Sequence, residues 1–419
     1  MNIKNINAIE ILDSNGFPTV EVTVVLDDGT VATGAVPSGA STGDAEAVEI
    51  RDNDPKRFSG KGVLTAVDNV NNVLKKYVLG KDAYEQEVVD KLLIEVDGTE
   101  NKSKYGANAI LPISMAICRA SAKSQKMELF EYFGKLSGNS KFALPQPMIL
   151  VMEGGKHGDW ATDFQEYFVI PKRDRFGNFK ESLRAGAEIF HALKKVLKGK
   201  GYDTGVGFEG AYCPKEIKSN SEVFDLIIEA VKVAGYYMND EIVLGADMAA
   251  SEFYQDGNYV LKSEGVKLTN KEWINKQLEL YQRYPIWSIE DTLDQNSWED
   301  WAELNRLVGD KMQIIGDDLL VTNVDKIKKG IELKSMNGVL IKLNQIGTVT
   351  QTVDAIKLAH SAGLQTIISH RGGETNDDMI ADLCVGTGSG QSKFGGPDRG
   401  ERVAKYNRLL KIESALIGA

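Results

Sequence analysis

The chain has 419 residues, which is too many for one ordinary hydrophobic core and enough for a large domain and a smaller one. Its composition, 42% hydrophobic and 26% charged, is typical of a soluble globular protein. The formal net charge of -11 argues against nucleic acid as the main partner, because phosphate binding requires a basic face.

The first part of the chain combines alternating and helical patterns. Apolar residues at every second position in "FPTVEVTVVL", followed by Asp27-Asp28-Gly29, predict an antiparallel meander. Helical periodicity follows in "GVLTAVDNVNNVLKKYVLG", "AYEQEVVDKLLIEVDG" and "NAILPISMAICRASAKSQ", and the last run is apolar on nearly every side. We therefore expect an α+β domain over residues 1–134, with "GKLSGNSKFALPQP" as a linker.

Residues 135–419 show a different rhythm, in which short apolar runs recur between helical stretches. The runs are "EIVLGADMA", "YPIWSIEDT", "KMQIIGDDL", "GVLIKLNQI", "LQTIISHRGG" and "ADLCVGTG". Alternation of strand and helix over this length predicts an α/β fold with a parallel sheet, and six such units favour a closed (β/α)8 barrel. An open doubly wound sheet is the alternative, but no G-x-G-x-x-G phosphate loop follows an early strand.

Charged side chains follow these runs, each at the point where a strand is expected to end. They are Asp247, Glu290, Asp317, Lys342, His370 with Arg371, and Lys393 in a glycine-rich loop. The carboxyl ends of neighbouring barrel strands meet at one mouth, so three carboxylates would face two lysines and an arginine across it. One such residue alone would indicate only a solvated strand end, whereas six in succession predict a functional site.

The carboxylates among these residues predict a metal site. Three carboxylates without a cysteine or a second histidine among them are hard oxygen ligands, which indicates Mg²⁺ rather than zinc. Lys342 follows a buried apolar run, so its amine must reach water, meet a carboxylate or titrate near neutrality. We favour a proton-transfer role for Lys342 at the mouth, and a plain ion pair with one of the acids is the alternative.

Other features carry expectations about where the protein works. The three cysteines, Cys118, Cys213 and Cys384, show no paired spacing, which suits a reducing compartment and argues against thiol-bound zinc. The N-terminal run lacks the apolar core of a signal peptide, and no segment approaches membrane-spanning length. We expect a cytoplasmic protein with neither a membrane nor a nucleic-acid partner.

Several longer motifs resemble one family. "VLIKLNQIGTVTQT" is similar to the enolase signature, and "SIED", "GDDLLVTN" and "SHRGGET" stand around it in enolase order and spacing. Near the N-terminus, "VPSGASTG" resembles the mobile enolase loop that closes over substrate. The resemblance extends over nearly the whole chain. It implies an α+β cap before a modified TIM barrel, a homodimer that could assemble further, and two Mg²⁺ ions per active site.

The resemblance also implies a lyase of the phosphopyruvate hydratase type, a hydro-lyase that reversibly dehydrates 2-phosphoglycerate to phosphoenolpyruvate in glycolysis and gluconeogenesis. Lys342 would take the proton from carbon 2, while Glu209 would help the hydroxide at carbon 3 to depart, supported by Glu166. The higher-affinity metal would be held by Asp247, Glu290 and Asp317, and the second metal by Ser41. The substrate would be bound by His157, His370, Arg371, Lys393 and Ser41, with its phosphate on Arg371 and its carboxylate on Lys393.

The match departs from the family pattern at several positions near the expected site. The residues that differ from the usual ones are Asn15, Phe17, Ala45, Glu153, Asp159, Trp160, Phe208, Ala211, Thr292 and Gly372. Glu153 replaces an expected Asn, and Gly372 stands where a serine ordinarily adds a phosphate hydrogen bond. Most of the catalytic charges are therefore retained while their surroundings change.

These departures leave alternatives to the dehydration of 2-phosphoglycerate. One is an enolase-fold paralogue with a larger or differently charged substrate, such as the carboxyphosphonoenolpyruvate synthase of phosphonate and phosphinate biosynthesis. The other is a non-catalytic surface or scaffold protein that has kept the fold. We favour the dehydration because each role in it is still filled. The scaffold ranks last, since neither a metal ligand nor Lys342 is lost.

Overall fold

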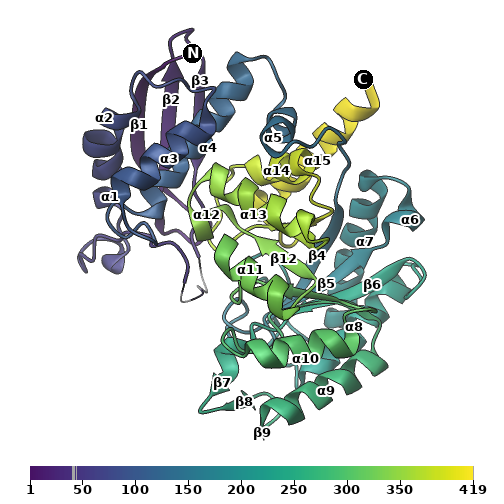
Figure 1. Ribbon diagram of the computed structural model, residues 1–419. Coiled ribbons are helices and arrows are strands. Elements are labelled where there is room, and N and C mark those ends of the chain that lie inside the picture. The colour runs from purple at the N-terminus through teal and green to yellow at the C-terminus, as the bar shows by residue number, and fades with distance from the viewer. Residues whose placement is uncertain (40–42, 44, 419) are drawn as a thin grey trace.

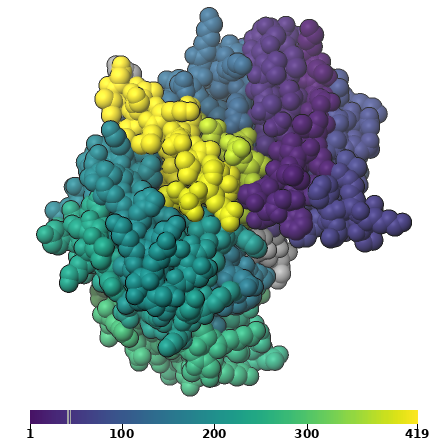
Figure 2. All heavy atoms as spheres, turned by 180° about the vertical axis from the view of Figure 1, so that it is seen from behind, coloured from purple at the N-terminus to yellow at the C-terminus, as the bar shows by residue number. Residues whose placement is uncertain are grey.

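The computed structural model describes residues 1–39, 43 and 45–418, and it shows a small N-terminal sheet with helices beside a closed barrel (Figure 1). Seen from behind, the N-terminal residues lie at the upper right and the barrel segments fill the lower left (Figure 2). None of the helices in these described ranges is long and apolar enough to cross a membrane.

The elements have the following bounds. The strands are β1 (Ile3–Leu12), β2 (Pro18–Leu26), β3 (Val31–Ala35), β4 (Gln146–Glu153), β5 (Glu166–Pro171), β6 (Ile242–Asp247), β7 (Tyr254–Gln255), β8 (Asn258–Leu261), β9 (Val266–Leu268), β10 (Ile286–Glu290), β11 (Gln313–Gly316), β12 (Gly338–Ile341), β13 (Gln365–Ser369) and β14 (Gln391–Lys393). The helices are α1 (Leu64–Asp68), α2 (Lys75–Val78), α3 (Gln86–Asp97), α4 (Ala107–Ser124), α5 (Leu129–Ser137), α6 (Arg173–Phe176), α7 (Phe179–Gly199), α8 (Asn220–Val233), α9 (Asn270–Arg283), α10 (Trp298–Val308), α11 (Val324–Leu333), α12 (Leu343–Ile346), α13 (Val349–Ser361), α14 (Met379–Thr387) and α15 (Gly400–Gly418). A π-helical turn, Asn69–Leu74, joins α1 to α2, and 3₁₀ turns lie at Phe58–Gly60 and Ala250–Phe253.

The N-terminal unit is the antiparallel sheet β1-β2-β3 covered by α4. The alternating residues of β2 bury Val20, Val22 and Val24 completely, as the period of two predicts. At Gly34 of β3 a Cβ would lie 2.7 Å from the Cβ of Met115 on α4, so only glycine lets the helix pack this close. Because α4 also contacts α12 and α13, the helix joins the sheet to the barrel.

The barrel closes in the order β10-β11-β12-β13-β14-β4-β5-β6, which confirms the predicted closed barrel. Its interior is filled by apolar side chains from several strands, including Leu150, Phe168, Ile315, Leu340 and Ile367. These residues form a packed plug rather than a channel, so any polar site must lie at one end of the barrel.

The predicted parallel sheet has one exception, because β5 runs antiparallel to both β4 and β6. No helix separates β4 from β5 within the described residues, so the chain returns directly instead of crossing over. As a result the first residue of β5, Glu166, lies at the mouth, opposite Glu153 of β4 and Asp247 of β6. A conventional parallel strand would have carried Glu166 to the opposite end.

The last predicted strand is also misplaced. "ADLCVGTG", from Ala381 to Gly388, lies mainly in α14, and the final barrel strand is the short β14 that ends at Lys393. Every residue of α14 is buried, so its apolar character reflects a helix enclosed on all sides. Periodicity alone does not separate such a helix from a buried strand.

Local sequence sets the position of Lys342 between β12 and α12. All four residues of β12 are buried, and α12 is a single turn that ends at Gly347, where φ is +92°. That conformation favours glycine because it has no Cβ. Thr348 then caps α13 by accepting a hydrogen bond from the backbone N–H of Gln351. Lys342 is therefore held between the buried strand β12 and the single helical turn α12.

The N-terminal unit meets the barrel next to the loop that follows β13. Ser38 and Gly373 form an isolated antiparallel bridge, and the Ser38 hydroxyl donates to Asp13 Oδ2 at 2.5 Å. Nearby, Arg119 of α4 pairs with Asp377 at 2.8 Å. Burial alone would raise the pKa of Asp377, but Arg119 holds it below its ordinary value.

We expect Arg119→Met to lower the free energy of unfolding by about 2–4 kcal/mol at pH 7, because it leaves Asp377 buried and ionised without its partner. Since the pKa of Asp377 is depressed in the folded state, the wild-type contribution is complete above the unfolded value of about 3.9 and is lost as the pH falls below it. Urea unfolding at pH 7 and at low pH measures both effects.

A matched control for this experiment is Arg306→Met, which removes an exposed pair with Glu303 on α10. It should leave the unfolding midpoint unchanged. Equal effects of the two substitutions would contradict the role assigned to Arg119.

Candidate active site

The charged strand ends lie directly above the apolar plug. Side chains alternate inward and outward along a strand, so a residue two positions after an inward-facing one also faces inward. Leu340 precedes Lys342 in this way, and Ile315 precedes Asp317. The plug and the charged mouth are therefore successive layers of the same barrel interior.

Lys393 is the centre of the largest cluster of opposite charges. Its Nζ lies 2.8 Å from Glu166 Oε2, 3.1 Å from Asp247 Oδ2 and 2.7 Å from Glu290 Oε1. All four residues are at most 4% exposed. Burial alone would lower the pKa of Lys393, but Asp247 and the other carboxylates raise it well above its ordinary value. The ammonium therefore stays charged and balances part of a cluster that could not be buried without it.

Lys342 meets a carboxylate, which is one of the three outcomes that the sequence left open. Its Nζ contacts Asp317 Oδ2, and Gln345 Nε2 donates to the other oxygen of that carboxylate at 2.7 Å. Burial alone would lower the pKa of Lys342, but Asp317 raises it. In this state Lys342 is an ammonium, so a role as a base requires that the contact with Asp317 be weakened first.

Glu209 lies in a third cluster, between two histidines. His157 Nδ1 is 3.1 Å from Glu166 Oε1 and 3.5 Å from Glu209 Oε1. Burial alone would lower the pKa of His157, but Glu209 and Glu166 raise it to about 10. The imidazole therefore holds a proton between two carboxylates at neutral pH. The three side chains together can store a proton and pass it to a bound ligand.

His370, on the other side of Glu209, has a different charge state. Its Nε2 is 3.2 Å from Glu209 Oε2, while its Nδ1 lies 2.7 Å from Nη1 of Arg402 on α15. A guanidinium only donates, so Nδ1 must accept and the ring proton resides on Nε2. Burial lowers the pKa of His370 to about 3, despite Glu209, so the ring is neutral and presents an N–H donor to the site.

Arg402 was missed by sequence reasoning. It is fully buried and also donates to the backbone carbonyls of Phe208, Arg371 and Gly372. Its segment reads as an ordinary amphipathic helix with several charges, and no local pattern distinguishes the buried arginine from the exposed ones. Only the placement of α15 against the mouth reveals its contact with His370.

Arg371 faces the same cavity and contacts a residue of the N-terminal unit. Its Nη1 donates to Glu46 Oε2 at 2.9 Å and to Asn344 Oδ1 at 3.0 Å. The pKa of Arg371 would fall on burial alone, but Glu46 raises it. Glu46 was not predicted, although it lies close to the expected closing loop. Ser41, the residue predicted from that loop, lies outside the described residues.

The predicted metal ligands Asp247, Glu290 and Asp317 end neighbouring strands, and their donor set is all oxygen. Asp247 and Glu290 are paired in the strand register, while Asp317 follows β11 directly. Asp317 is also grouped with Asp291 and Asp318, whose carboxylate oxygens lie within 4.8 Å of it. Asp291 accepts the backbone N–H groups of Asp317 and Asp318 at 2.9 Å each, so it fixes the turn that presents Asp317.

This arrangement fits a divalent cation that prefers oxygen. Lys393 and Lys342 contact the predicted ligands and supply the positive charge that such an ion would also supply. Glu290 Oε2 is buried and makes no hydrogen bond within the described ranges. Glu290 Oε2 therefore has capacity for a further ligand.

These clusters line one small cavity at the mouth. Its walls are His157, Gln165, Glu166, Glu209, Asp247, Lys342, Ser369, His370, Arg371, Gly372 and Lys393. One more buried atom at the mouth, His157 Nε2, also makes no hydrogen bond in the part of the chain described. Buried polar atoms normally have partners, so His157 Nε2 and Glu290 Oε2 indicate room for a polar ligand.

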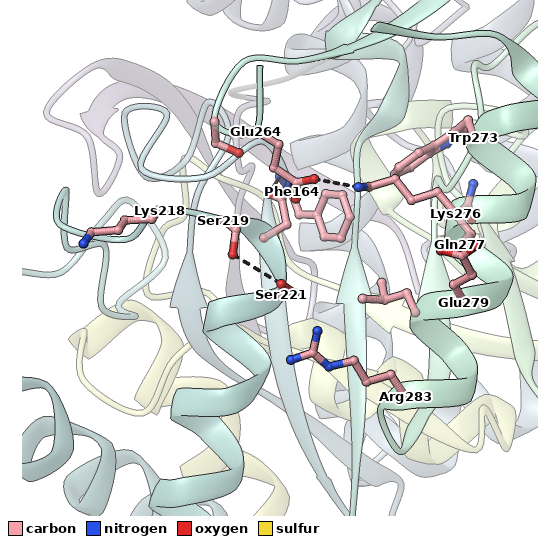
Figure 3. Close-up of a pocket in the computed structure, with 13 residues that line it drawn as sticks. Phe164, Lys218, Ser219, Ser221, Glu264, Trp273, Lys276, Gln277, Glu279 and Arg283 are labelled. Carbon is pink, nitrogen blue, oxygen red and sulfur yellow. Dashed lines mark hydrogen bonds and ion pairs between the residues drawn. The ribbon is translucent and has the colours of Figure 1, made fainter. Parts of the chain in front are cut away.

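A wider cavity lies away from the mouth, between the start of α8, the segment after β8 and α9 (Figure 3). Its charged side chains include Lys276, which pairs with Glu264 at 2.7 Å, and Arg283, which pairs with Asp225. These pairs are partly exposed, whereas the charges at the mouth are buried and shift one another's pKa values. The charged mouth is therefore the better candidate for chemistry.

Comparison with protein families agrees with this architecture. The model of the enolase N-terminal domain matches residues 3–133, and that of the enolase C-terminal TIM barrel domain matches residues 141–419. The chain belongs to the enolase family. Enolases are enzymes that generally depend on a metal, which accords with the carboxylates at the mouth.

Some residues that depart from the enolase pattern lie around this cavity. Gly372 is part of the wall, and its carbonyl accepts a hydrogen bond from Arg402 at 2.7 Å. The ring centroid of Phe208 is 6.5 Å from that of His157, and its side chain is 43% exposed. Trp160 is equally exposed, with Lys262 Nζ 5.7 Å from its ring centroid. The charged core is thus retained, while Gly372 and Phe208 differ beside it.

The two site histidines should titrate in opposite directions. The pKa of His157 is raised to about 10, so His157 should remain an imidazolium from pH 5 to 9. The pKa of His370 is lowered to about 3, so His370 should remain neutral over the same range, with its proton on Nε2. Imidazole ¹⁵N NMR on the metal-free protein measures both states. The chain has four histidines, and the exposed His191 supplies a reference signal.

Glu209→Gln is the matching variant for this measurement. Removing the carboxylate charge should lower the pKa of His157 toward its ordinary range, while His370 should stay neutral because Arg402 still occupies Nδ1. A His370 signal that becomes imidazolium near pH 6.5 would contradict the assigned hydrogen bond.

Proposed function

We propose that this protein is a hydro-lyase that catalyses the Mg²⁺-dependent, reversible dehydration of 2-phosphoglycerate to phosphoenolpyruvate. The observation that carries the proposal is that Lys342 and Glu209 line one small buried cavity and come from different elements. Lys342 follows β12, while Glu209 lies in the loop between α7 and α8. A base and an acid placed in this way suit the removal of a proton from one carbon and of hydroxide from the next.

Asp247, Glu290 and Asp317 are the residues that would hold the first Mg²⁺, and Ser41 would take part in the second site. When bound, Mg²⁺ would supply positive charge beside the substrate carboxylate. Lys342 would act as a base only once its contact with Asp317 is weakened.

The remaining roles fall to cationic and acidic side chains in the same cavity. Lys393 is positioned to neutralise the substrate carboxylate, and Arg371 to bind the phosphate in exchange for Glu46. Lys342 Nζ would accept the proton from carbon 2. Glu209 would deliver a proton to the hydroxide that leaves carbon 3, with Glu166 and His157 holding that proton beside it.

A second candidate is the enolase-fold paralogue that acts on a larger phosphorylated carboxylate, with carboxyphosphonoenolpyruvate synthase as the example. The exposed Phe208 and Trp160 favour it, since two large aromatic side chains could contact an extended substrate. In either case we infer a cytoplasmic homodimer whose ligand is a small phosphorylated carboxylate.

The direct test is to incubate the purified protein with 2-phosphoglycerate and Mg²⁺ and to record the ultraviolet absorbance of the enol product. We expect absorbance to rise, to stop when a chelator removes Mg²⁺, and to resume when Mg²⁺ is restored. Folded, metal-bound protein that gives no product would exclude this reaction and favour the paralogue.

Lys342→Ala tests the base. We expect exchange of the carbon-2 proton with solvent to be abolished, since no other lysine in the described site lines the cavity except Lys393, which is held by three carboxylates. Mg²⁺ binding measured by calorimetry should remain. Lys328→Ala, which removes an exposed lysine of α11, is the control and should exchange normally. Residual exchange in Lys342→Ala would assign the base to another residue.

A further inference from the structure

Glu153 is a buried carboxylate at the mouth for which the proposed reaction has no role. It is the last residue of β4 and only 1% exposed. Its carboxylate lies under the loop Gly207–Ala211, which carries Glu209. Oε1 accepts the backbone N–H of Ala211 at 2.7 Å and that of Glu209 at 3.1 Å, and Oε2 is 3.2 Å from the same Glu209 nitrogen.

The backbone N–H groups of this loop show how much depends on Glu153. Gly207 donates to Ala211, Phe208 to His157 and Gly210 weakly to Gly207, all within the backbone. The two remaining donors, those of Glu209 and Ala211, have the Glu153 carboxylate as their acceptor. Both residues are buried, so without Glu153 these two N–H groups would lose their partner and could not turn to water.

The opposite side of the loop is held by the segment after β14. Gly396 donates its N–H to the carbonyl of Glu209 at 2.8 Å, and Arg399 Nε donates to the carbonyl of Gly207 at 3.1 Å. A Cβ at Gly207 would lie 2.3 Å from Glu153 Oε2, so glycine is what lets the carboxylate reach the loop. The loop is therefore held on one side by the Glu153 carboxylate and on the other by the donors of Gly396 and Arg399.

We propose that Glu153 is a positioning residue for Glu209, and that its carboxylate sets where the Glu209 side chain meets the leaving hydroxide. This inference deepens the proposed function and rests on it. The asparagine expected from the family pattern offers one acceptor oxygen on a shorter side chain, whereas Glu153 offers two on a longer one. In this chain both N–H groups of the loop are therefore held by a single carboxyl group.

A second effect of Glu153 follows from its charge. Burial and the neighbouring Glu209 raise the pKa of Glu153 to about 8. Burial alone would raise the pKa of Glu209, but His370 and His157 lower it well below its ordinary value. The two carboxyl groups therefore resist being ionised together, and near neutral pH the proton resides on Glu153 while Glu209 is ionised.

The test compares two reactions of one enzyme in the variant Glu153→Ala, with Glu209→Gln as the benchmark. Exchange of the carbon-2 proton depends on Lys342, whereas loss of hydroxide also depends on Glu209. We expect Glu153→Ala to lower kcat for dehydration about 100-fold, because displacing a catalytic group by about 1 Å lowers the rate by a factor of this order. The rate of proton exchange and KM should each change by less than about threefold. Glu209→Gln should show the same split.

Glu153→Gln and Glu153→Asp separate the contributions. Glu153→Gln keeps an oxygen that can accept both N–H groups, so it should retain at least about a tenth of the dehydration rate. Glu153→Asp keeps a carboxyl group but withdraws it by one methylene, so it should resemble Glu153→Ala. Without any substrate it should also lower the raised pKa of His157 by displacing Glu209.

The control is Glu413→Ala. Glu413 is another buried carboxylate that accepts two consecutive backbone N–H groups, those of Phe179 and Lys180, far from the mouth. It should lower thermal stability without altering the ratio of exchange to dehydration. Should Glu153→Ala fail to fold, Glu153→Asp gives the same comparison.

The outcomes separate the two proposals. If wild-type protein does not dehydrate 2-phosphoglycerate, the proposed function fails, and the His157 titration in Glu153→Asp still decides whether Glu153 positions Glu209. If wild-type protein is active, dehydration at the wild-type rate in both Glu153→Ala and Glu153→Asp overturns the inference. Equal loss of exchange and dehydration would also overturn it.

Discussion

The burial of many charges at one barrel mouth is the constraint on which the rest of this structure depends. Several carboxylates lie there with little or no exposure, together with Lys342, Lys393 and Arg371, and each unpaired charge would cost several kcal/mol. They are tolerated because each cation contacts acids from other elements: Lys393 contacts three carboxylates, Lys342 contacts Asp317 and Arg371 contacts Glu46. Such a network holds its geometry only if the strands beneath it cannot move. The closed barrel with its apolar plug supplies that rigidity, since neither the strand register nor the packed interior can shift without breaking hydrogen bonds and opening voids.

The antiparallel strand β5 contributes a further carboxylate to this buried network. A mouth built only from parallel strands receives side chains from strand ends and the loops that follow them. By running antiparallel, β5 adds its first residue, Glu166, at the level of Asp247 and Glu290, so a carboxylate that would otherwise need a loop is held by a strand register. Glu166 then serves two clusters at once, since one oxygen contacts Lys393 and the other contacts His157. The cluster of oxygen ligands and the proton-holding cluster are coupled through this one side chain.

Much of this site was visible in the sequence, because strand ends follow the period of two and because barrel strands end at a common mouth. That reasoning located Asp247, Glu290, Asp317 and Lys342, and the interpretation of Lys342 as paired or proton-transferring remained open until Asp317 was seen beside it. It failed for Ala381–Gly388, because a helix enclosed on all sides has no polar face to reveal its period. The same reasoning could not find Arg402 or the contacts of Glu153, because those depend on how α15 and the loop at Gly207 pack over the mouth. Such long-range packing leaves no local pattern in the sequence.

The contacts of Glu46 suggest that domain docking and site assembly are one process. Glu46 belongs to the N-terminal unit, yet it accepts from Arg371 and from Gln345, and Gln345 in turn donates to Asp317. A phosphate that displaced Glu46 from Arg371 would therefore also disturb a chain of hydrogen bonds that reaches an expected metal ligand. Because each of these groups has only a few possible partners in a buried setting, exchanging one contact alters the next. The Glu46 carboxylate thus ties the N-terminal unit to Arg371, the residue proposed to bind phosphate, and through Gln345 to the carboxylate that pairs with Lys342.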